Sequence, residues 1–184
     1  MTDGTASAGI APIPPGGLPA ALSGLAAVLV DAVAGGASVN FMAGFSEPEA
    51  RAWWAALQPA VDAGRSVLFT AAVEGRIVGT VILGLDVPPN QPHRGEIRKL
   101  LVLREARRRG VARRLMEAAE AEAVRRGLTL LTLDTMRGGA AEALYLSLGY
   151  AVTGIVPGYA LFPDGRPGDT TFFHKVLSAS PGGS

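Results

Sequence analysis

One stretch of the chain constrains its fold more than any other, because it reads as strand, basic turn, amphipathic helix and strand. The strand-like runs cover 96–103 and 128–135, and the helix-like run between them covers 110–126. In that middle run, apolar residues recur at the spacing of one helical face, at Ala112, Leu115, Met116, Ala119 and Ala123. Because strand–helix–strand crossovers are right-handed, we expect the two strands to be parallel neighbours in one sheet.

The rest of the chain adds further strands and helices around this unit. Gly35-Gly36 follows an Ala- and Leu-rich helical run, and Ser46-Glu47-Pro48-Glu49 has the form of a helix start. We expect helices at 18–34, 46–64 and 140–148 and strands at 10–13, 66–73, 76–87, 150–156 and 170–177. The predicted fold is an α/β (α+β) sandwich with a mixed central sheet of about six to seven strands and about four helices.

The 184 residues are enough for one domain and too few for two. We expect this domain to cover 10–177, with disordered tails at 1–9 and 178–184, which are small, polar and Gly/Pro/Ser-rich. The chain has no cysteine, which excludes disulfides, Cys-ligated zinc and thiol nucleophiles. The start lacks the form of a signal peptide and no run is long enough to span a bilayer, so we expect a cytoplasmic protein with no membrane partner.

Positive charge is concentrated locally although the formal net charge is only +1. Basic residues cluster between positions 98 and 114, at Arg98, Lys99, Arg104, Arg107, Arg108, Arg109, Arg113 and Arg114. A local cationic cluster favours a local anionic ligand. A nucleic-acid-binding module is one interpretation, but Glu117, Glu120 and Glu122 follow directly and interrupt any extended basic face. We therefore expect no nucleic-acid partner.

The basic turn at 107–112 lies where a strand ends and its crossover helix begins. The first-turn amide groups of that helix have no partner within it, the helix dipole is positive there, and Gly110 allows close approach to the main chain. These properties suit a pyrophosphate. Neither a Walker A sequence nor GxGxxG is present. A solvated basic turn that only caps the helix is the alternative, and the turn alone does not decide between the two.

The context of this turn resembles the GCN5-related N-acetyltransferase (GNAT) family. The similarity lies in the RxxGxA turn after a strand, the short AEALY helix at 141–145 and the Gly149-Tyr150 pair. The resemblance implies a GNAT fold with acetyl-CoA as cosubstrate, a turn that binds the coenzyme A pyrophosphate, and a preceding strand whose main chain pairs with the pantetheine arm. By this resemblance the cofactor residues are Leu100, Leu101, Val102, Arg107, Arg108, Arg109, Gly110, Val111, Ala112 and Arg113.

Two positions depart from the family pattern. Ala112 stands where the family usually has glycine, a tolerated change. Gly138 stands where the next helix often begins with an asparagine that contacts the cofactor, so no side-chain contact is expected there.

Within the family, several segments are similar to the tabtoxin resistance acetyltransferases, which inactivate a β-lactam toxin. These segments are GGASVNFMA at 35–43, Glu96, LDT at 133–135, AEALY at 141–145 and PGYALFPDGR at 157–166. The similarity implies acetyl transfer but leaves the acceptor open, since one fold serves many substrates.

Acetyl transfer to an amine requires a neutral nucleophile, whereas an alkylammonium has a pKa of about 10.4. Glu96 and Asp134, on the two parallel strands beside the turn, are the candidate bases, and the resemblance gives the matching acids this role. Repulsion and burial would raise at least one pKa. The structural alternative is that Glu96 pairs with Arg98 or Lys99 and that Asp134 caps the next turn.

Tyr145 lies in the helix where the family commonly places a tyrosine that protonates or hydrogen-bonds the departing coenzyme A sulfur. The resemblance thus makes Tyr145 the third catalytic candidate. The alternative is a half-buried aromatic residue that packs on Leu144 and Leu148. A main-chain N–H near Val102 is expected to polarise the thioester carbonyl.

The acceptor-binding candidates are Phe41 and Met42, in the loop that carries the closer resemblance, and Tyr159, before the last strand. Trp53 and Trp54 have helical spacing and are more typical of a core. Both histidines, at 93 and 174, lack an acidic partner at a suitable spacing, and no motif indicates a metal site.

The predicted function is acetyl-CoA-dependent N-acetylation of an amine, or of a hydroxyl, on a small molecule, with a β-lactam or amino-acid-like toxin as the finer hypothesis. The rival interpretations are an acyl-CoA-binding sensor without turnover and the nucleic-acid module above. Related folds often dimerise by pairing C-terminal strands, which makes a homodimer an expectation that the sequence does not fix.

Overall fold

The computed structural model describes residues 8–177, in which seven strands form one mixed sheet. The strands are β1 (Gly9–Pro12), β2 (Ser66–Val73), β3 (Arg76–Gly84), β4 (Arg94–Val102), β5 (Leu130–Met136), β6 (Ala151–Leu161) and β7 (Pro167–Val176), in the sheet order β1-β2-β3-β4-β5-β7-β6. The helices are α1 (Leu18–Ala34), α2 (Glu47–Ala55), α3 (Gln58–Asp62), α4 (Val111–Arg125) and α5 (Ala140–Ser147), with a 3-10 turn at Arg104–Ala106. The predicted α/β fold with a mixed sheet is confirmed.

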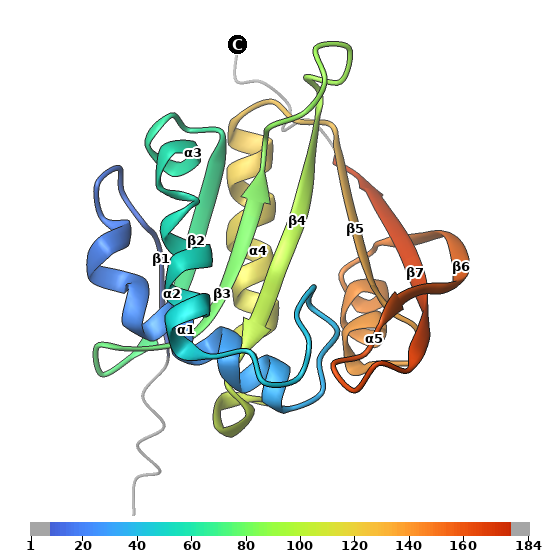
Figure 1. Cartoon of the computed structure of the whole chain (residues 1–184). Coiled ribbons are helices and arrows are strands. Elements are labelled where there is room, and N and C mark those ends of the chain that lie inside the picture. Colours follow the sequence, from blue (N-terminus) through green and yellow to red (C-terminus); the bar gives the residue numbers. More distant parts are fainter. Residues whose placement is uncertain (1–7, 178–184) are drawn as a thin grey trace, which may run out of the picture.

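Helices cover both faces of the sheet, and Figure 1 shows α2 and α3 on the near side with α4 on the far side. The side of α4 that packs on the sheet is fully buried, including Leu115 and Met116. Opposite it, Leu25 and Leu29 of α1 and Trp54 of α2 are buried as well. These two apolar layers hold the sheet rigid, including the residues at its centre.

The centre of the sheet is where the strands separate. β4 and β5 are the one parallel pair in the described sheet, and their register contains only Arg94↔Leu130, Gly95↔Leu131 and Glu96↔Thr132. Beyond Glu96 and Thr132 the two strands diverge, as Figure 1 shows. We call this unpaired part of β4 and β5 the fork.

A β-bulge in β4 accompanies this divergence. The β3–β4 register passes from Thr80↔Leu101 to Ile82↔Arg98, so two residues, Lys99 and Leu100, face one on β3. Lys99 has φ 52°, in the left-handed region that glycine normally occupies at such bulges. The bulge bends and twists β4 at the level of the fork.

The helix expected at 46–64 is wrong in its extent. Ser46 caps α2 with a capping box to Glu49, as the sequence predicts, but α2 ends at Ala55 and a separate α3 follows. Pro59 lies in the first turn of α3, where a missing N–H costs nothing, whereas a continuous helix would lose a hydrogen bond there.

The ends of the domain also differ slightly from expectation. β1 begins at Gly9 and Ala8 is buried, so these two residues belong to the fold and not to a tail. β6 runs from Ala151 to Leu161 and is longer than the expected 150–156, because bulges let it follow β7 around the hairpin. The remainder of the two expected tails, 1–7 and 178–184, lies outside the described residues. No helix within 8–177 is long and apolar enough to cross a membrane.

Candidate active site

The turn before α4 exposes main-chain amides to a ligand. Arg108 has φ 61° and Gly110, the N-cap of α4, has φ 74°. No side chain caps this helix, so the amides of its first turn are open to an outside acceptor. Left-handed residues next to a helix start produce a concave nest of N–H groups that suits an anion.

The arginine side chains around this turn point in different directions. Arg107 Nε donates to the Val102 carbonyl oxygen at 3.1 Å, which keeps its guanidinium at the end of β4 beside the turn. Arg113 instead donates to Ser147 Oγ at 2.7 Å and so links α4 to α5. Of the expected cofactor residues, Arg113 therefore offers its main chain to the turn and directs its side chain to α5.

The strand edge beside the fork is unpaired over the part of β4 that the resemblance assigns to pantetheine. Leu101 and Val102 pair with Thr80 and Gly79 of β3, and no strand among residues 8–177 pairs with their other side. An extended ligand that passes from the turn into the fork would find an unpaired strand edge there, on which the Val102 carbonyl oxygen already accepts from Arg107.

The two candidate acids lie at the closed end of the fork. Glu96 is the last residue of β4 in register with β5, and Asp134 lies two residues beyond its partner Thr132. Register partners and residues two apart share a face, so Glu96, Thr132 and Asp134 point to the same side of the sheet.

Burial and the neighbouring Glu96 charge raise the pKa of Asp134, while Lys99 opposes this shift. Neither acid forms an ion pair or a side-chain hydrogen bond among the described residues. The structural alternatives, an ion pair of Glu96 with Arg98 or Lys99 and a turn cap by Asp134, are therefore absent there.

Tyr145 approaches the fork from the opposite face. Its ring centroid lies 5.8 Å from that of Phe173, which pairs with Leu133 on the face covered by α5. Asp134 is the next residue in β5 and points the other way. Burial, followed by the charge of Asp134, raises the pKa of Tyr145, so its phenol stays protonated. Tyr145 and the acid pair thus lie on opposite faces of the sheet at β5.

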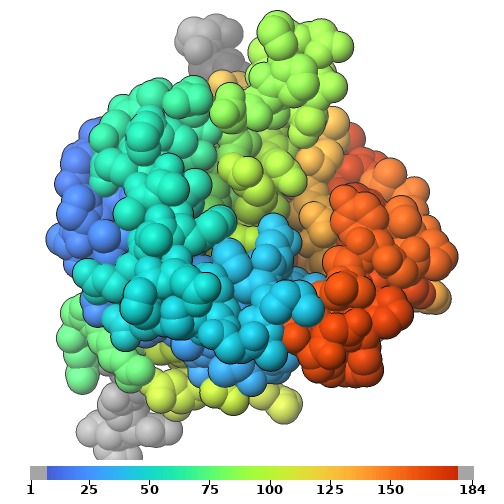
Figure 2. Space-filling view, viewed as in Figure 1, coloured from blue at the N-terminus to red at the C-terminus, as the bar shows by residue number. Residues whose placement is uncertain are grey.

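The loop between α1 and α2, residues 35–46, crosses the fork. Lys99 Nζ of β4 donates to the Val39 carbonyl oxygen at 3.0 Å, and Ser38 Oγ donates to the Leu161 carbonyl oxygen at 2.6 Å. The Ala43 amide also donates to the Pro163 carbonyl oxygen at 2.9 Å. Figure 2 shows the light-blue atoms of this crossing loop against the orange atoms of the β6–β7 hairpin. The loop is therefore fastened on both sides of the fork.

The acceptor-binding candidates are arranged around this crossing loop. The Phe41 ring stacks on Phe45 at 4.0 Å between centroids and meets Trp53 edge-on at 5.7 Å. Met42, also in the loop, is 48% exposed. Trp54 is fully buried and Trp53 is partly buried against the same core, as expected for core residues, and Trp53 also contacts Phe41 of the loop.

Tyr159 comes close to the acids through one intermediate residue. Its ring packs edge-on against Phe172 at 5.1 Å, and Phe172 is the β7 partner of Asp134. Phe172 and Phe45 carry no motif and are missing from the sequence-based site predictions, which name Lys99 only in the basic cluster and as an alternative partner of Glu96.

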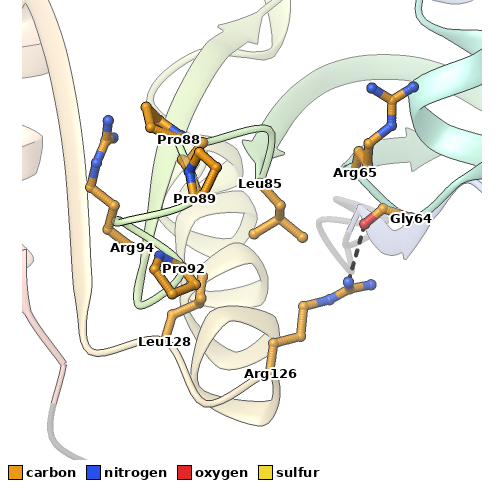
Figure 3. Close-up of a pocket in the computed structure, with 10 residues that line it drawn as sticks. Gly64, Arg65, Leu85, Pro88, Pro89, Pro92, Arg94, Arg126 and Leu128 are labelled. Carbon is orange, nitrogen blue, oxygen red and sulfur yellow. Dashed lines mark hydrogen bonds between the residues drawn. The ribbon is translucent and has the colours of Figure 1, made fainter.

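A hollow lies at the other end of β4 and does not belong to this site. It is lined by Gly64, Arg65, Leu85, Val87, Pro88, Pro89, Pro92, Arg94, Arg126 and Leu128. Figure 3 shows Arg126 turned to the Gly64 carbonyl oxygen, at 3.2 Å, while Arg65 and Arg94 point away from the hollow. The guanidinium groups do not converge on one ligand. No group of His, Asp and Glu with metal-binding geometry occurs within 8–177.

Comparison with known proteins decides the family. Residues 36–150 match the acetyltransferase (GNAT) family, a span that includes the turn, the fork and α5. The chain belongs to the GNAT family. It is accordingly an acyltransferase that uses acetyl-CoA as its cosubstrate.

Solved GNAT structures share the whole fold. The ribosomal-protein-alanine N-acetyltransferase of Brucella melitensis is 26% identical, with a TM-score of 0.74 over 91% of this chain and 99% of that one. A putative acetyltransferase of Salmonella typhimurium, solved with acetyl-CoA, is 21% identical, with a TM-score of 0.75 over 96% and 97%. A phosphinothricin acetyltransferase of Sinorhizobium meliloti, also in complex with acetyl-CoA, is 18% identical, with a TM-score of 0.77 over 95% and 91%.

The residues of this chain fit acetyl-CoA. The open amides at Gly110 and the first turn of α4 match a pyrophosphate, and the unpaired edge at Leu100, Leu101 and Val102 matches an amide-containing arm.

Proposed function

We propose that this protein moves the acetyl group of acetyl-CoA onto the amine of a small molecule, with Glu96 and Asp134 as the groups that take the amine proton. One observation carries the proposal. Two carboxylates without ion-pair partners among residues 8–177 share a face at the closed end of the fork, next to the free strand edge. Acids left without a structural partner in a site of this kind are candidates for catalysis.

The cofactor-binding part of the proposal places the pyrophosphate at 107–112 and the pantetheine arm along Leu100, Leu101 and Val102. Acetyl-CoA supplies an activated acyl thioester. A main-chain N–H near Val102 donates to the acyl oxygen, where charge develops during attack. The side chain of Arg107, held at the end of β4, adds positive charge beside the turn.

Proton transfer is divided between the two faces of the fork. On one face, Glu96 and Asp134 take the proton of the acceptor ammonium, directly or through water, and so expose its lone pair. The raised pKa of Asp134 brings it nearer to working pH, which strengthens it as a base. On the other face, the neutral phenol of Tyr145 donates to the departing sulfur.

The acceptor part of the site favours a small ligand. The crossing loop is fastened to β4 through Lys99 and to the β6–β7 hairpin through Ser38 and Ala43, so it limits access from that side. We assign Phe41, Met42 and Tyr159 to the walls around the acceptor. A β-lactam or amino-acid-like toxin is the finer hypothesis, and the fold similarity to a phosphinothricin acetyltransferase makes such compounds the first acceptors to try.

A thiol-release assay tests the proposal. The protein and acetyl-CoA are incubated with a panel of small amines, amino acids, β-lactam amino acids and matched alcohols, and products are identified by mass. We expect thiol release that depends on an amine and yields its N-acetyl derivative. Acetyl-CoA binding without release for any acceptor would favour the sensor, and release with alcohols alone would assign O-acetylation.

Tyr145→Phe tests the opposite face of the fork. The substitution keeps the buried ring and removes only the hydroxyl, so we expect kcat to fall by roughly 10²-fold, the lower range for a lost general acid. The acetyl-CoA Kd and the unfolding midpoint should remain close to those of the parent. Tyr150→Phe, a second buried tyrosine of the same ring cluster, is the control. A parent-like kcat in Tyr145→Phe would make Tyr145 a packing residue only.

We also propose that the protein forms a homodimer through the free edge of β6. This strand ends the sheet, and its exposed apolar residues are Val152, Ile155, Val156, Tyr159 and Leu161. A long exposed apolar edge invites strand pairing. Light scattering should give twice the chain mass, and Ile155→Lys should reduce it to the monomer mass while the circular dichroism spectrum stays unchanged. A monomeric parent would contradict the proposal.

A further inference from the structure

The fork contains a cation that the reaction as proposed above does not use. Lys99 Nζ lies 5.6 Å from the ring centroid of Phe41 and 5.2 Å from that of Trp53, within cation–π range. It also donates to the Val39 carbonyl oxygen of the crossing loop. Glu96 and Asp134 both act on it electrostatically. Lys99 is thus the one described lysine that joins the loop, α2 and the acid pair.

The backbone at Lys99 is unfavourable for this residue type. Its φ of 52° places a long side chain in a conformation that glycine adopts without cost. The position lies in the bulge of β4, where glycine would satisfy the backbone. The chain nevertheless keeps a lysine there.

Burial of the Lys99 ammonium is a second unfavourable feature, in addition to its backbone conformation. Lys99 is half-buried, and this burial, reinforced by Arg98, lowers its pKa to about 8 in spite of the nearby carboxylates. A residue that combines a strained backbone with a desolvated ammonium contributes little to folding. Strain of this kind concentrates at functional sites, where the surrounding structure holds it.

The contacts of Lys99 indicate what a lysine with a strained backbone and a half-buried ammonium does at this position. Without Lys99, the crossing loop would have no described hydrogen bond to β4 and would be fastened only to the β6–β7 hairpin. The carboxylates of Glu96 and Asp134 would also lose the cation that opposes the pKa rise of Asp134. The Lys99 ammonium therefore contacts the loop and also acts electrostatically on Asp134.

We propose that Lys99 is a positioning residue for acetyl transfer, whose ammonium holds the crossing loop over the fork, next to the acid pair. This inference rests on the proposed function of Glu96 and Asp134. Lys99 itself need not touch the acceptor. It acts through the loop on acceptor binding and through its charge on the base.

Three variants test the proposal. Lys99→Met keeps the apolar stem and removes the charge, Lys99→Arg restores a cation, and Arg98→Met is the matched control. Arg98 carries the same charge one position earlier on β4, but it is exposed and its guanidinium lies against Gly84 on β3. Each variant is measured for kcat and KM over a pH series, for acetyl-CoA Kd and for its unfolding midpoint.

In Lys99→Met, we expect the acceptor KM to rise about tenfold and the acetyl-CoA Kd to stay the same. The Asp134 pKa, freed from a nearby cation, should rise, so the acid limb of the kcat/KM profile should move to higher pH. Lys99→Arg should return that limb toward its parental position. The unfolding midpoint of Lys99→Met should not fall below that of the parent.

Two measurements do not require turnover. Hydrogen exchange of the Ala43 amide should accelerate in Lys99→Met, and the carboxyl NMR titration of Asp134 should shift upward. An unchanged exchange rate and an unchanged titration would overturn the proposal for Lys99, even in an active enzyme. If the exchange rate and the titration both change, but the parent protein releases no thiol from acetyl-CoA with any acceptor, the role of Lys99 in positioning the loop stands and the proposed function fails. A loss of activity that only follows a lower midpoint, with a parental pH profile, would make Lys99 merely structural.

Discussion

Replacing Glu96 by Gln or Asp134 by Asn is expected to reduce acetyl transfer by roughly 10²- to 10⁴-fold, the range typical of a lost general base. Each amide keeps the shape of the side chain, and neither acid makes an ion pair among residues 8–177 that the change would break. The acetyl-CoA Kd, measured by calorimetry, should therefore stay near the parental value. Each single variant would therefore bind acetyl-CoA like the parent but transfer its acetyl group far more slowly.

The double variant shows whether the two acids act as one unit. Groups that serve one step are strongly non-additive, so Glu96→Gln with Asp134→Asn should be barely slower than the slower single variant. Asp86→Asn is the control, because Asp86 is an exposed acid that pairs with Arg65 away from the fork. It should retain parental kinetics.

The pH dependence gives the same hypothesis a second test. The pKa of Asp134 is raised, so the parent should lose kcat/KM as the pH falls through that raised value and the carboxylate gains a proton. The deficit of the variants should shrink as the pH rises, because an acceptor that is already neutral needs no base. Full activity of both single variants at neutral pH with an amine acceptor would leave Glu96 and Asp134 as structural acids and place the base elsewhere.

The elements of this fold could be predicted because their signals are local. The apolar spacing in 110–126 and the two flanking strand runs predict a parallel pair of strands. The rule of right-handed crossovers then makes these two strands neighbours in one sheet. The capping residues of α2 are likewise read from four consecutive letters at Ser46. The prediction of one helix over 46–64 is wrong at its end. Pro59 has no N–H, which a continuous helix would need there, but the first turn of a new helix does not need it.

The site could be predicted only in part because its remaining contacts are distant in sequence. Lys99 stands in a basic cluster, where its charge suggests an anionic ligand. In the fold, a bulge with φ 52° turns it toward two rings and two carboxylates. A bulge leaves no periodic signal in one strand, since it is defined by the register with its partner. The contact of Tyr159 with Phe172 depends in the same way on the β6–β7 register.

The second prediction with a large expected effect concerns the turn at 107–112 and the stabilisation of the protein by acetyl-CoA. Acetyl-CoA at one hundred times its Kd should stabilise the native protein by about 2.7 kcal/mol, visible as a raised unfolding midpoint. Arg107→Glu should remove most of this ligand-induced rise. Its guanidinium lies at the end of β4 next to the amide nest, and a carboxylate there replaces a charge-assisted contact with repulsion.

The control for this prediction is Arg51→Glu, which makes the same charge change at an exposed position of α2, where Arg51 faces Glu47 at 3.9 Å. This variant is itself expected to be slightly less stable, since it places like charges one helical turn apart. Its increase in midpoint on adding acetyl-CoA should nevertheless match that of the parent, because the increment reports binding to the native state and not intrinsic stability. If both variants lost the increment equally, long-range charge would explain the effect, and the turn at 107–112 would not be the pyrophosphate site.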